Sequence, residues 1–247
     1  MQATQEGGAG TTCSRVGLLR RLRKWWEVRV TRPFVELDPP GKFSRRLDMV
    51  RCAAALFLRD GIAAVRMTDV AEVADVGVAT LYRRFKTKTG LVIAAGTFLW
   101  NRFNDHVRSF IIEPAFVSAT GAAELDMLFA WYRDAYLSYP DFVRFVEDFD
   151  HLVLAEKVDP ELLVEYARAV DSFYPIFEGA YRQGLADGSI RREVDFGVLY
   201  RTAAHAMMGI AQRIAHGDVI PSDDFTHGAE ELDCVAHMTR LALGIAE

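Results

Sequence analysis

Two short helical patterns lie close together in this chain, at residues 68–74 and 78–85. Only Asp75-Val76-Gly77 separates them. These lengths of helix, turn and helix suit a helix-turn-helix. An earlier apolar pattern starts at Ser44 and ends at Gly61, where a left-handed cap is expected. The sequence therefore predicts three consecutive helices, of which the last two are joined by a tight turn.

Longer helical patterns follow, and chain breakers separate them. Asp159 and Asp195 stand where a carboxylate would cap a helix start, and the segment GLADGSI at 184–190 supplies a glycine stop. The alternation typical of strands is absent. We expect an all-α protein in which the three-helix domain precedes a larger helical domain. The longer patterns cover about 88–112, 121–138, 141–155, 160–184, 195–216 and 228–245.

The composition is that of a globular protein. Of 247 residues, 51% are hydrophobic and 26% are charged, which is enough to bury a sizeable core. Cys13, Cys52 and Cys234 are widely spaced, which disfavours a disulfide framework and a zinc site. No apolar run approaches the roughly 18 residues that span a bilayer, and the start is too rich in arginine for a signal peptide. We expect a cytoplasmic protein.

The charge is unevenly distributed along the chain. Residues 1–91 carry a net charge of +8 and residues 92–247 carry −13, within a total of −5. A small nucleic-acid-binding module joined to an acidic partner domain would show this asymmetry. The alternative is a chance excess from the arginine-rich start.

The third helix presents a short basic face. At about 100° per residue, its inward side chains turn toward the core, while Ala79, Thr80, Arg83 and Lys86 turn away from it. The predicted inward set is Phe57, Leu58, Val70, Val76, Leu81 and Phe85. A small residue at the helix start allows close approach to a major groove. An ordinary three-helix bundle with a solvated basic face is the alternative.

The polar residues of this segment fit DNA. Arg83 suits a bidentate guanine contact or a phosphate, and Thr80 suits a phosphate or a base edge. Tyr82 flanks the face and offers its hydroxyl to the backbone. Lys88 starts the next long helix, where its ammonium and the free N–H groups of the helix can hold another phosphate.

At these residues the chain resembles the TetR-like bacterial transcriptional regulators. The resemblance covers residues 45–91, through AAALF at 53–57, Gly61, and DVAEVADVGVATLYRRFKTKTGL at 69–91. It implies an N-terminal DNA-binding domain, and a C-terminal helical domain that binds a small effector and forms a homodimer. The candidate DNA-contacting residues are Thr68, Val78, Ala79, Thr80, Tyr82, Arg83, Arg84, Lys86 and Lys88.

The chain departs from the family pattern at four positions. Asp75 replaces a frequent glycine in the turn, and aspartate tolerates left-handed geometry. Gly77 and Arg66 stand where serine and threonine often cap the two short helices, which weakens these caps. Arg84 replaces a frequent histidine and adds charge beside the DNA backbone.

Aromatic residues are concentrated between residues 98 and 181, which hold 18 of the 28 in the chain. Core packing alone would explain any one of them. The resemblance places a ligand cavity among these helices, so we expect a mainly apolar pocket with tyrosine hydroxyls as orienting groups. The candidate ligand-binding residues are Trp100, Phe103, His106, Phe129, Tyr132, Tyr136, Phe145, Phe149, Tyr166 and Phe173.

The last two helical patterns carry small and apolar residues that allow another helix to approach. In TetR-like proteins the last two helices of each subunit form a four-helix dimer interface; a monomeric bundle core is the alternative. Two-fold symmetry would pair with a pseudo-palindromic operator. The candidate interface residues are Ala203, Ala206, Met207, Gly209, Ile210, Leu232, Val235 and Leu241.

Three domains follow: a basic arm at 1–43, the helix-turn-helix domain at 44–91, and the effector and dimerisation domain at 92–247. The arm includes LLRRLRKWWEVRV at 18–30. This segment suits a membrane-surface helix or a DNA-binding extension. A third reading is that translation starts later and the arm is absent.

Other classes of protein find little support. Asp195-Phe196-Gly197 lacks the companion motifs of a kinase and is read as a helix start. The histidines show no metal-ligand spacing, and no nucleophile has a recognisable base, so we expect no metal, no cofactor and no catalysis. The sequence predicts a repressor that binds double-stranded operator DNA and is released by a small, mainly apolar or aromatic effector. A ligand-responsive activator and, from another class, a helical enzyme acting on an apolar substrate are the alternatives.

Overall fold

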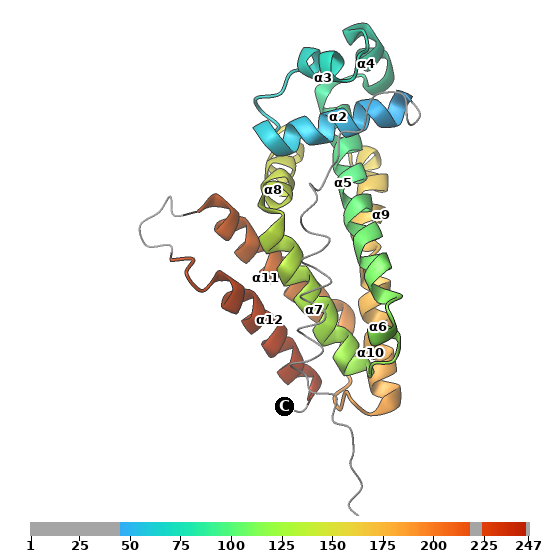
Figure 1. The fold of residues 1–247 in the computed structure, drawn as a ribbon, viewed down its shortest axis with the longest axis vertical. Coiled ribbons are helices and arrows are strands. Elements are labelled where there is room, and N and C mark those ends of the chain that lie inside the picture. Colours follow the sequence, from blue (N-terminus) through green and yellow to red (C-terminus); the bar gives the residue numbers. More distant parts are fainter. Residues whose placement is uncertain (1–44, 218–223, 246–247) are drawn as a thin grey trace, which may run out of the picture. The chain divides into compact units, whose positions relative to one another are not determined.

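The computed structural model describes residues 45–217 and 224–245, and these residues are helical without strands. They belong to one compact unit, Phe34–Glu247; the other unit, Met1–Pro33, lies outside the described residues together with the predicted arm. The expected all-α class is confirmed (Figure 1). The α-helices are α2 (Arg45–Asp60), α3 (Met67–Val73), α4 (Val78–Phe85), α5 (Lys88–Ile111), α6 (Pro114–Val117), α7 (Gly121–Ser138), α8 (Pro140–Ala155), α9 (Val164–Asp171), α10 (Tyr174–Asp187), α11 (Phe196–His216) and α12 (Gly228–Leu243), and Pro160–Leu163 forms a 3-10 helix.

Local backbone signals end α2 and turn the chain between α3 and α4. Gly61 adopts φ +81° and donates its N–H to Phe57 O at 3.0 Å. Asp75 adopts φ +50°, the left-handed geometry expected of it in the tight turn. The N–H of Arg66 donates to Asp69 Oδ2 at 2.8 Å, so the third residue of α3 supports the helix start at which threonine is missing.

The three N-terminal helices share a small core. Val70 and Leu81 are completely buried, and Phe57 and Phe85 are nearly so. Leu58 and Val76 were also predicted to face this core, but both are only half-buried. Leu56 and Phe57 share the buried side of α2, and Leu58, a further ~100° around the helix, lies at the edge of that side. The remaining space is filled by buried Leu56 and Ile62.

The first turn of α5 lies close against the end of α4. Thr87 caps α5, with its Oγ1 accepting the N–H of Gly90 at 3.0 Å. A Cβ at Gly90 would lie 2.3 Å from Phe85 O, so only glycine fits there. Helix α5 packs against α2, α8 and α9, and α2 also packs against α8 (Figure 1). Two helices of the larger part therefore contact α2, the helix on which α3 packs.

The prediction of a single helix at 160–184 is wrong. The structure has the 3-10 helix, α9 and α10 in its place, with a break at Ser172-Phe173. Pro175 lacks an N–H and cannot donate to the carbonyl of Asp171, so a continuous helix loses a hydrogen bond there. Proline is well tolerated in the first turn of a helix, which is its position in α10. The short helix α6 was also not expected.

Helices α7 and α10 approach each other closely at one end. A Cβ on Gly121 would lie 2.0 Å from Gly184 N, so a side chain at this position would meet the backbone of α10. The N–H of Gly121 donates to Asp187 Oδ2 at 2.9 Å, and that of Ala122 donates to Ser189 Oγ at 3.0 Å. The end of α10 thus caps the start of α7.

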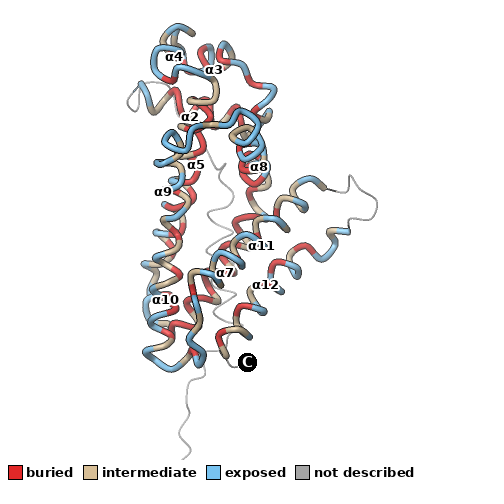
Figure 2. The backbone as a smooth tube through the Cα atoms, turned by 180° about the vertical axis from the view of Figure 1, so that it is seen from behind, coloured by how far each residue is buried: buried red, intermediate tan, exposed pale blue. Residues whose placement is uncertain are grey.

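Helices α11 and α12 lie side by side at one edge of the helical assembly (Figure 1). Asp195 caps α11 as expected, its Oδ1 accepting the N–H of Val198 at 3.0 Å. Gly188 and Gly244 end α10 and α12 in the left-handed conformation. Figure 2 shows exposed and half-buried residues along much of α11 and α12 beside the buried ones.

Candidate functional site

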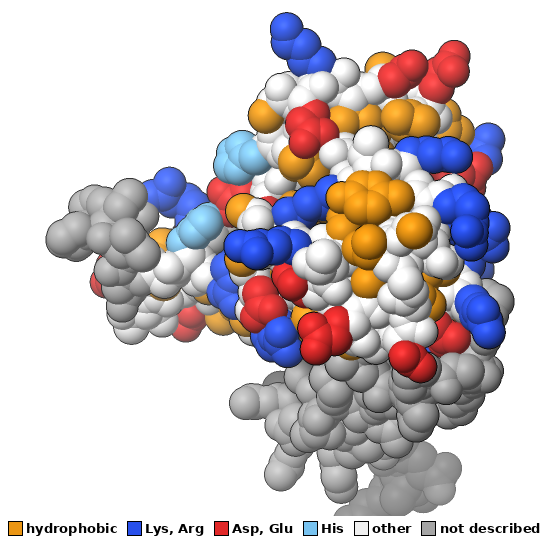
Figure 3. Space-filling model, turned by 90° about the horizontal axis from the view of Figure 1, so that it is seen from above, with side chains coloured by type: hydrophobic (Ala, Val, Ile, Leu, Met, Phe, Trp, Pro, Cys, Tyr) orange, Lys and Arg blue, Asp and Glu red, His pale blue; other side chains and the backbone are white. Residues whose placement is uncertain are grey.

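The outward face of α4 is basic and accessible. Tyr82 is 49% exposed, and Arg83, Arg84 and Lys86 are exposed beside it. None of these three cations forms an ion pair with a described residue. Figure 3 looks onto the end of the molecule that carries α3 and α4 and shows Lys and Arg side chains spread across it. This face is therefore available to an anionic partner.

The other predicted DNA contacts lie on or near this face. Thr68 and Ala79 are exposed, and Val78 and Thr80 are half-buried. Gly77 caps α4 without a side-chain hydrogen bond, and its carbonyl accepts the N–H of Thr80 at 2.8 Å. The lack of a capping side chain leaves backbone N–H groups of the first turn open to a phosphate.

Lys88 makes an internal contact. Its Nζ donates to Ala63 O at 3.2 Å and so ties the start of α5 to the segment after α2. Burial lowers the pKa of Lys88, against the opposing effect of Glu156 and Asp69. Close by, Thr89 Oγ1 donates to Glu156 Oε2, which connects α5 to the end of α8. Phosphate binding by Lys88 stays a prediction.

Aromatic side chains fill the space between α5, α7, α8 and the break that precedes α10. Phe103 is at the centre: its ring centroid lies 4.8 Å from that of Trp131, 5.2 Å from Phe142 and 5.3 Å from Phe173. We call these residues the aromatic cluster: Trp100, Phe103, Trp131, Tyr132, Tyr136, Phe142 and Phe173. All seven are buried. The structure thus brings five of the predicted ligand-binding residues together.

The remaining predicted ligand residues extend from the cluster or lie apart from it. Tyr166 accepts a hydrogen bond from Trp100 Nε1 at 3.0 Å, and its ring stacks on Phe149 at 4.1 Å. Phe145 contacts Phe149, with ring centroids 6.2 Å apart. Phe129 contacts Phe177, whose ring lies 5.0 Å from Tyr132. His106 is half-buried, with its ring 6.3 Å from Tyr139.

Tyrosine hydroxyls stand at the α11 side of the cluster. Tyr132 and Tyr200 share a hydrogen bond of 3.1 Å between their hydroxyl oxygens. Burial raises the pKa of Tyr200 to about 12 and also raises that of Tyr132 well above its usual value, so both are neutral donors and acceptors near neutral pH. Tyr200 was not predicted, since it lies on a helix read only as a dimer element.

Other central residues were missed as well. Trp131, Phe142 and Phe177 share the helical spacing of their predicted neighbours, and that spacing was a usable signal. Asn104 is only 4% exposed and lies between Phe103 and Val107 on the buried face of α5. The sequence did mark Asn104, because it is a polar residue among the apolar residues of the buried helix face.

The predicted dimer residues divide into two groups. Ala203, Met207, Leu232 and Val235 are buried against their own subunit, whereas Ala206, Gly209 and Leu241 are exposed and Ile210 is half-buried. A groove of about 600 Å³ runs between α11 and α12. It is lined by His205, Ala206, Gly209, Ile210, Arg213, Asp224, Phe225 and Glu231.

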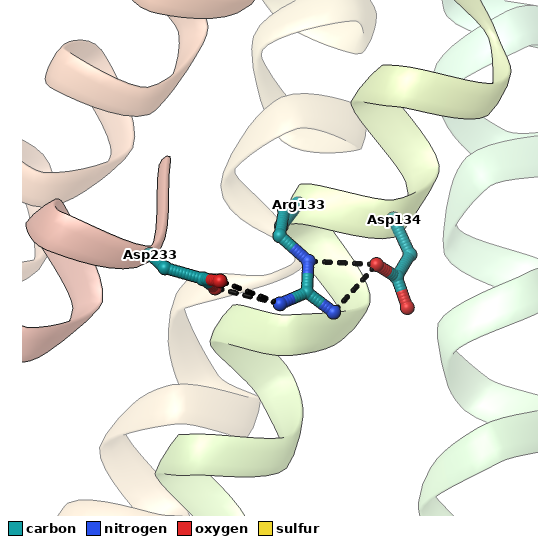
Figure 4. A network of polar contacts seen from close by, with 3 residues as sticks. All are labelled: Arg133, Asp134 and Asp233. Atoms are coloured by element: carbon teal, nitrogen blue, oxygen red, sulfur yellow. Dashed lines mark hydrogen bonds and ion pairs between the residues drawn. The ribbon is translucent and has the colours of Figure 1, made fainter. Parts of the chain in front are cut away.

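Two ion pairs bind α12 to α7. Arg133 Nη1 lies 2.7 Å from Asp233 Oδ1, and its guanidinium also pairs with Asp134 (Figure 4). Two turns further along, Arg240 of α12 pairs with Asp126 of α7. Because each helix contributes one cation and one anion, the pairs fix the antiparallel register of α12 on α7.

The described residues contain no group of three or more His, Cys, Asp or Glu side chains placed to hold a metal ion. None of the described helices is long and apolar enough to cross a membrane.

Residues 50–95 match the family described as bacterial regulatory proteins, tetR family. The HTH-type transcriptional repressor KstR2 of Rhodococcus jostii (strain RHA1) is 28% identical over 170 residues, which are 66% of this chain and 76% of that protein.

Solved structures have the same fold. FadR from Bacillus subtilis in complex with stearoyl-CoA aligns with a TM-score of 0.58 at 14% identity, over 80% of this chain and 98% of that chain. FadR from Thermus thermophilus in complex with lauroyl-CoA aligns with a TM-score of 0.56 at 19% identity, over 82% and 96%.

The helix-turn-helix with an exposed basic α4 defines a DNA-binding transcriptional regulator. The family match over residues 50–95, the curated relative and the shared fold show that the chain is similar to the TetR-like bacterial transcriptional regulators.

Proposed function

We propose that the chain is a homodimeric repressor that binds a pseudo-palindromic, double-stranded operator and is released from it by a small, mainly apolar or aromatic effector. The exposed basic face of α4 carries this proposal, because Arg83, Arg84 and Lys86 have no ion-pair partner among the described residues. Unpaired cations beside an exposed tyrosine suit phosphates and base edges. The relative KstR2 is itself described as a repressor.

DNA binding divides among these residues by position. Ala79 and Thr80 lie in the first turn of α4 and approach the groove, and Arg83 follows one turn later with the reach for a guanine. Tyr82, Arg84 and Lys86 flank this line and bind the DNA backbone. Lys88 Nζ has three N–H donors, so it can bind a phosphate while it donates to Ala63 O, and this contact links the proposed phosphate site to the segment after α2.

The dimer forms through exposed stripes on α11 and α12. Ala206, Gly209, Ile210 and Leu241 of the predicted set remain accessible, and Met238 is 55% exposed on the same helix as Leu241. Small residues on α11 allow a partner helix to approach closely. The four predicted residues that are buried hold α11 and α12 on their own subunit.

The effector site lies at the aromatic cluster in the larger domain, from about residue 92 onward. Buried rings favour an apolar body, and the Tyr132–Tyr200 hydroxyl pair supplies a polar end. Stearoyl-CoA and lauroyl-CoA are bound by two regulators that share the fold, so acyl-CoA thioesters are the first effectors to test. A protein with these partners works in the cytoplasm and needs no cofactor.

The test is recovery of operator DNA. The purified full-length protein is mixed with fragmented genomic DNA from its source, and the retained fragments are sequenced. An R83A/Y82F variant is compared with R168A, which removes an arginine that is also exposed but lies on α9. We expect one pseudo-palindrome, lost in the double variant and kept in R168A.

Retention without sequence preference, or retention unchanged in the double variant, would contradict operator reading by α4. A reporter placed behind the recovered sequence separates the modes of regulation. Loss of the regulator raises reporter output for a repressor and lowers it for an activator.

A further inference from the structure

Asn104 is a polar side chain placed deep inside the larger domain. It is 4% exposed, and its Nδ2 donates to the carbonyl of Ala169 on α9 at 2.8 Å. Its Oδ1 is buried and accepts no hydrogen bond from any described residue. A buried acceptor without a donor is destabilising, so such an atom calls for an explanation.

The orientation of this amide is determined by its neighbour. A carbonyl oxygen can only accept, so the NH₂ group of Asn104 must face Ala169 O, and Oδ1 must face the other way. Ser172 Oγ donates to the same carbonyl at 3.0 Å. The break between α9 and α10 leaves this carbonyl without its usual helical partner, and Asn104 and Ser172 together satisfy it.

Asn104 borders the aromatic cluster. On α5 it follows Phe103 directly and lies one turn after Trp100. Phe173, which follows Ser172 at the break, has its ring 6.0 Å from Trp100 and 5.3 Å from Phe103. Asn104 therefore lies on the turn of α5 that carries Trp100 and Phe103, and its amide binds the end of α9 just before the break at which Phe173 joins the cluster.

We infer that Asn104 Oδ1 is a binding group for the effector and accepts a hydrogen bond from a hydroxyl or amide N–H on it. This inference rests on the proposed effector site and narrows its ligand: an apolar or aromatic body that carries a hydrogen-bond donor. Asn104 of α5, beside the α9–α10 break, would bind the donor group of the effector. The Tyr132–Tyr200 pair, on α7 and α11, is a separate polar group. A site built to accept a hydrogen bond discriminates against an analogue that lacks the donor.

Paired probes test the inference. The probes are 4-phenylphenol and 4-methoxybiphenyl, and dodecan-1-ol and 1-methoxydodecane; in each pair the ether lacks the donor. Binding to the full-length protein is measured by isothermal titration calorimetry. We expect the donor-bearing member to bind about three- to tenfold more tightly in at least one pair, the size of one net hydrogen bond.

Variants test whether Asn104 causes the preference for the donor-bearing probe. N104L has a similar volume without the acceptor and should bind both members equally, whereas N104D retains an acceptor oxygen and should keep the preference. The matched control S172A removes the other hydrogen bond to Ala169 O while leaving Asn104 in place, so its preference should also persist.

Two results would overturn the inference in distinguishable ways. If wild type binds the probes but N104L shows the same preference as wild type, the acceptor role is wrong while the effector site stands. If wild type binds no probe and no acyl-CoA, the proposed effector site falls and the inference falls with it. A variant that fails to fold is recognised by circular dichroism. If N104L does not fold, N104A, which also lacks the acceptor, decides the outcome by losing or keeping the preference.

Discussion

Gly121 lies at the closest approach of α7 and α10. An alanine Cβ there would stand 2.0 Å from Gly184 N and 2.3 Å from Ala180 O, and the backbone cannot yield as a side chain can. We expect G121A to lower the free energy of unfolding by about 3 kcal/mol. Urea denaturation measures this. The control is G179A on α10, where a Cβ meets nothing within 4 Å and the better helix propensity of alanine should add about 0.5–1 kcal/mol.

The buried hydroxyl of Tyr200 should make the folded protein less stable at alkaline pH. Tyr200 has a pKa near 10 when unfolded and about 12 when folded, because burial disfavours the phenolate. The unfolded chain loses this proton first, so the stabilisation is complete below pH 10 and is lost as pH rises to 12. We expect the free energy of unfolding to fall by up to about 1.4 kcal/mol per pH unit from this group.

Chemical denaturation at pH 8, 10 and 11 checks this dependence. Y200F lacks the titrating group and should show a shallower fall between pH 10 and 11 than wild type. Equal slopes in the two proteins would contradict the assignment of the effect to Tyr200.

Single residues show where sequence reasoning succeeds and where it ends. The positive φ of Asp75 was predictable because the tight turn itself demands it. The role of Asn104 was not, because its partner is 65 residues away and the carbonyl needs a donor only where α9 ends. Five of the seven residues of the aromatic cluster were among the predicted ligand-binding residues, chosen from density, helical spacing and the family resemblance. Their proximity follows because aromatic side chains on buried helix faces meet where those helices pack, and ligand binding by them stays a prediction.

At the scale of elements, α7 and α12 are coupled by reciprocal charges. Arg133 is 25% exposed and Asp233 is 51% exposed, so solvent screens their attraction. We expect a double-mutant cycle of R133M and D233N to give a coupling free energy of about 0.5–1 kcal/mol in urea denaturation. The effect should shrink at high salt. A coupling of zero at low salt would show that Arg133 acts through Asp134 alone.

Helix starts and stops were predicted where the signal is local. Asp195 and Gly61 act within a few residues of their own position, and both do what the sequence indicates. The break at Ser172-Phe173 escaped prediction because apolar residues continue on both sides of it. Pro175 lies close to the break. The sequence alone does not distinguish a proline in the first turn of a new helix from a proline that kinks one longer helix.

At the scale of the whole molecule, the charge asymmetry of the sequence matches the proposed separation of DNA binding from effector binding and dimerisation. The basic excess belongs to the part that carries α4, and the acidic remainder carries the aromatic cluster and the proposed dimer stripes. The proposed boundary after residue 91 falls inside α5, so one continuous helix belongs to both parts. Composition can separate two functions along a chain, but it cannot show that a single helix joins them.

Operator binding by the proposed dimer should depend on the α11–α12 surface even though none of the proposed DNA contacts lies on these two helices. A charge placed in a helix–helix interface is desolvated without a partner, so M238E should dissociate the dimer. Sedimentation velocity should then report a folded monomer, and fluorescence anisotropy should show operator affinity reduced by about a hundredfold, because two linked half-site contacts become one. The matched control is L154E, which places the same charge at a side chain that is 75% exposed on α8, outside the proposed interface. If M238E stays dimeric, or if L154E loses the operator equally, the two-fold arrangement through α11 and α12 is wrong.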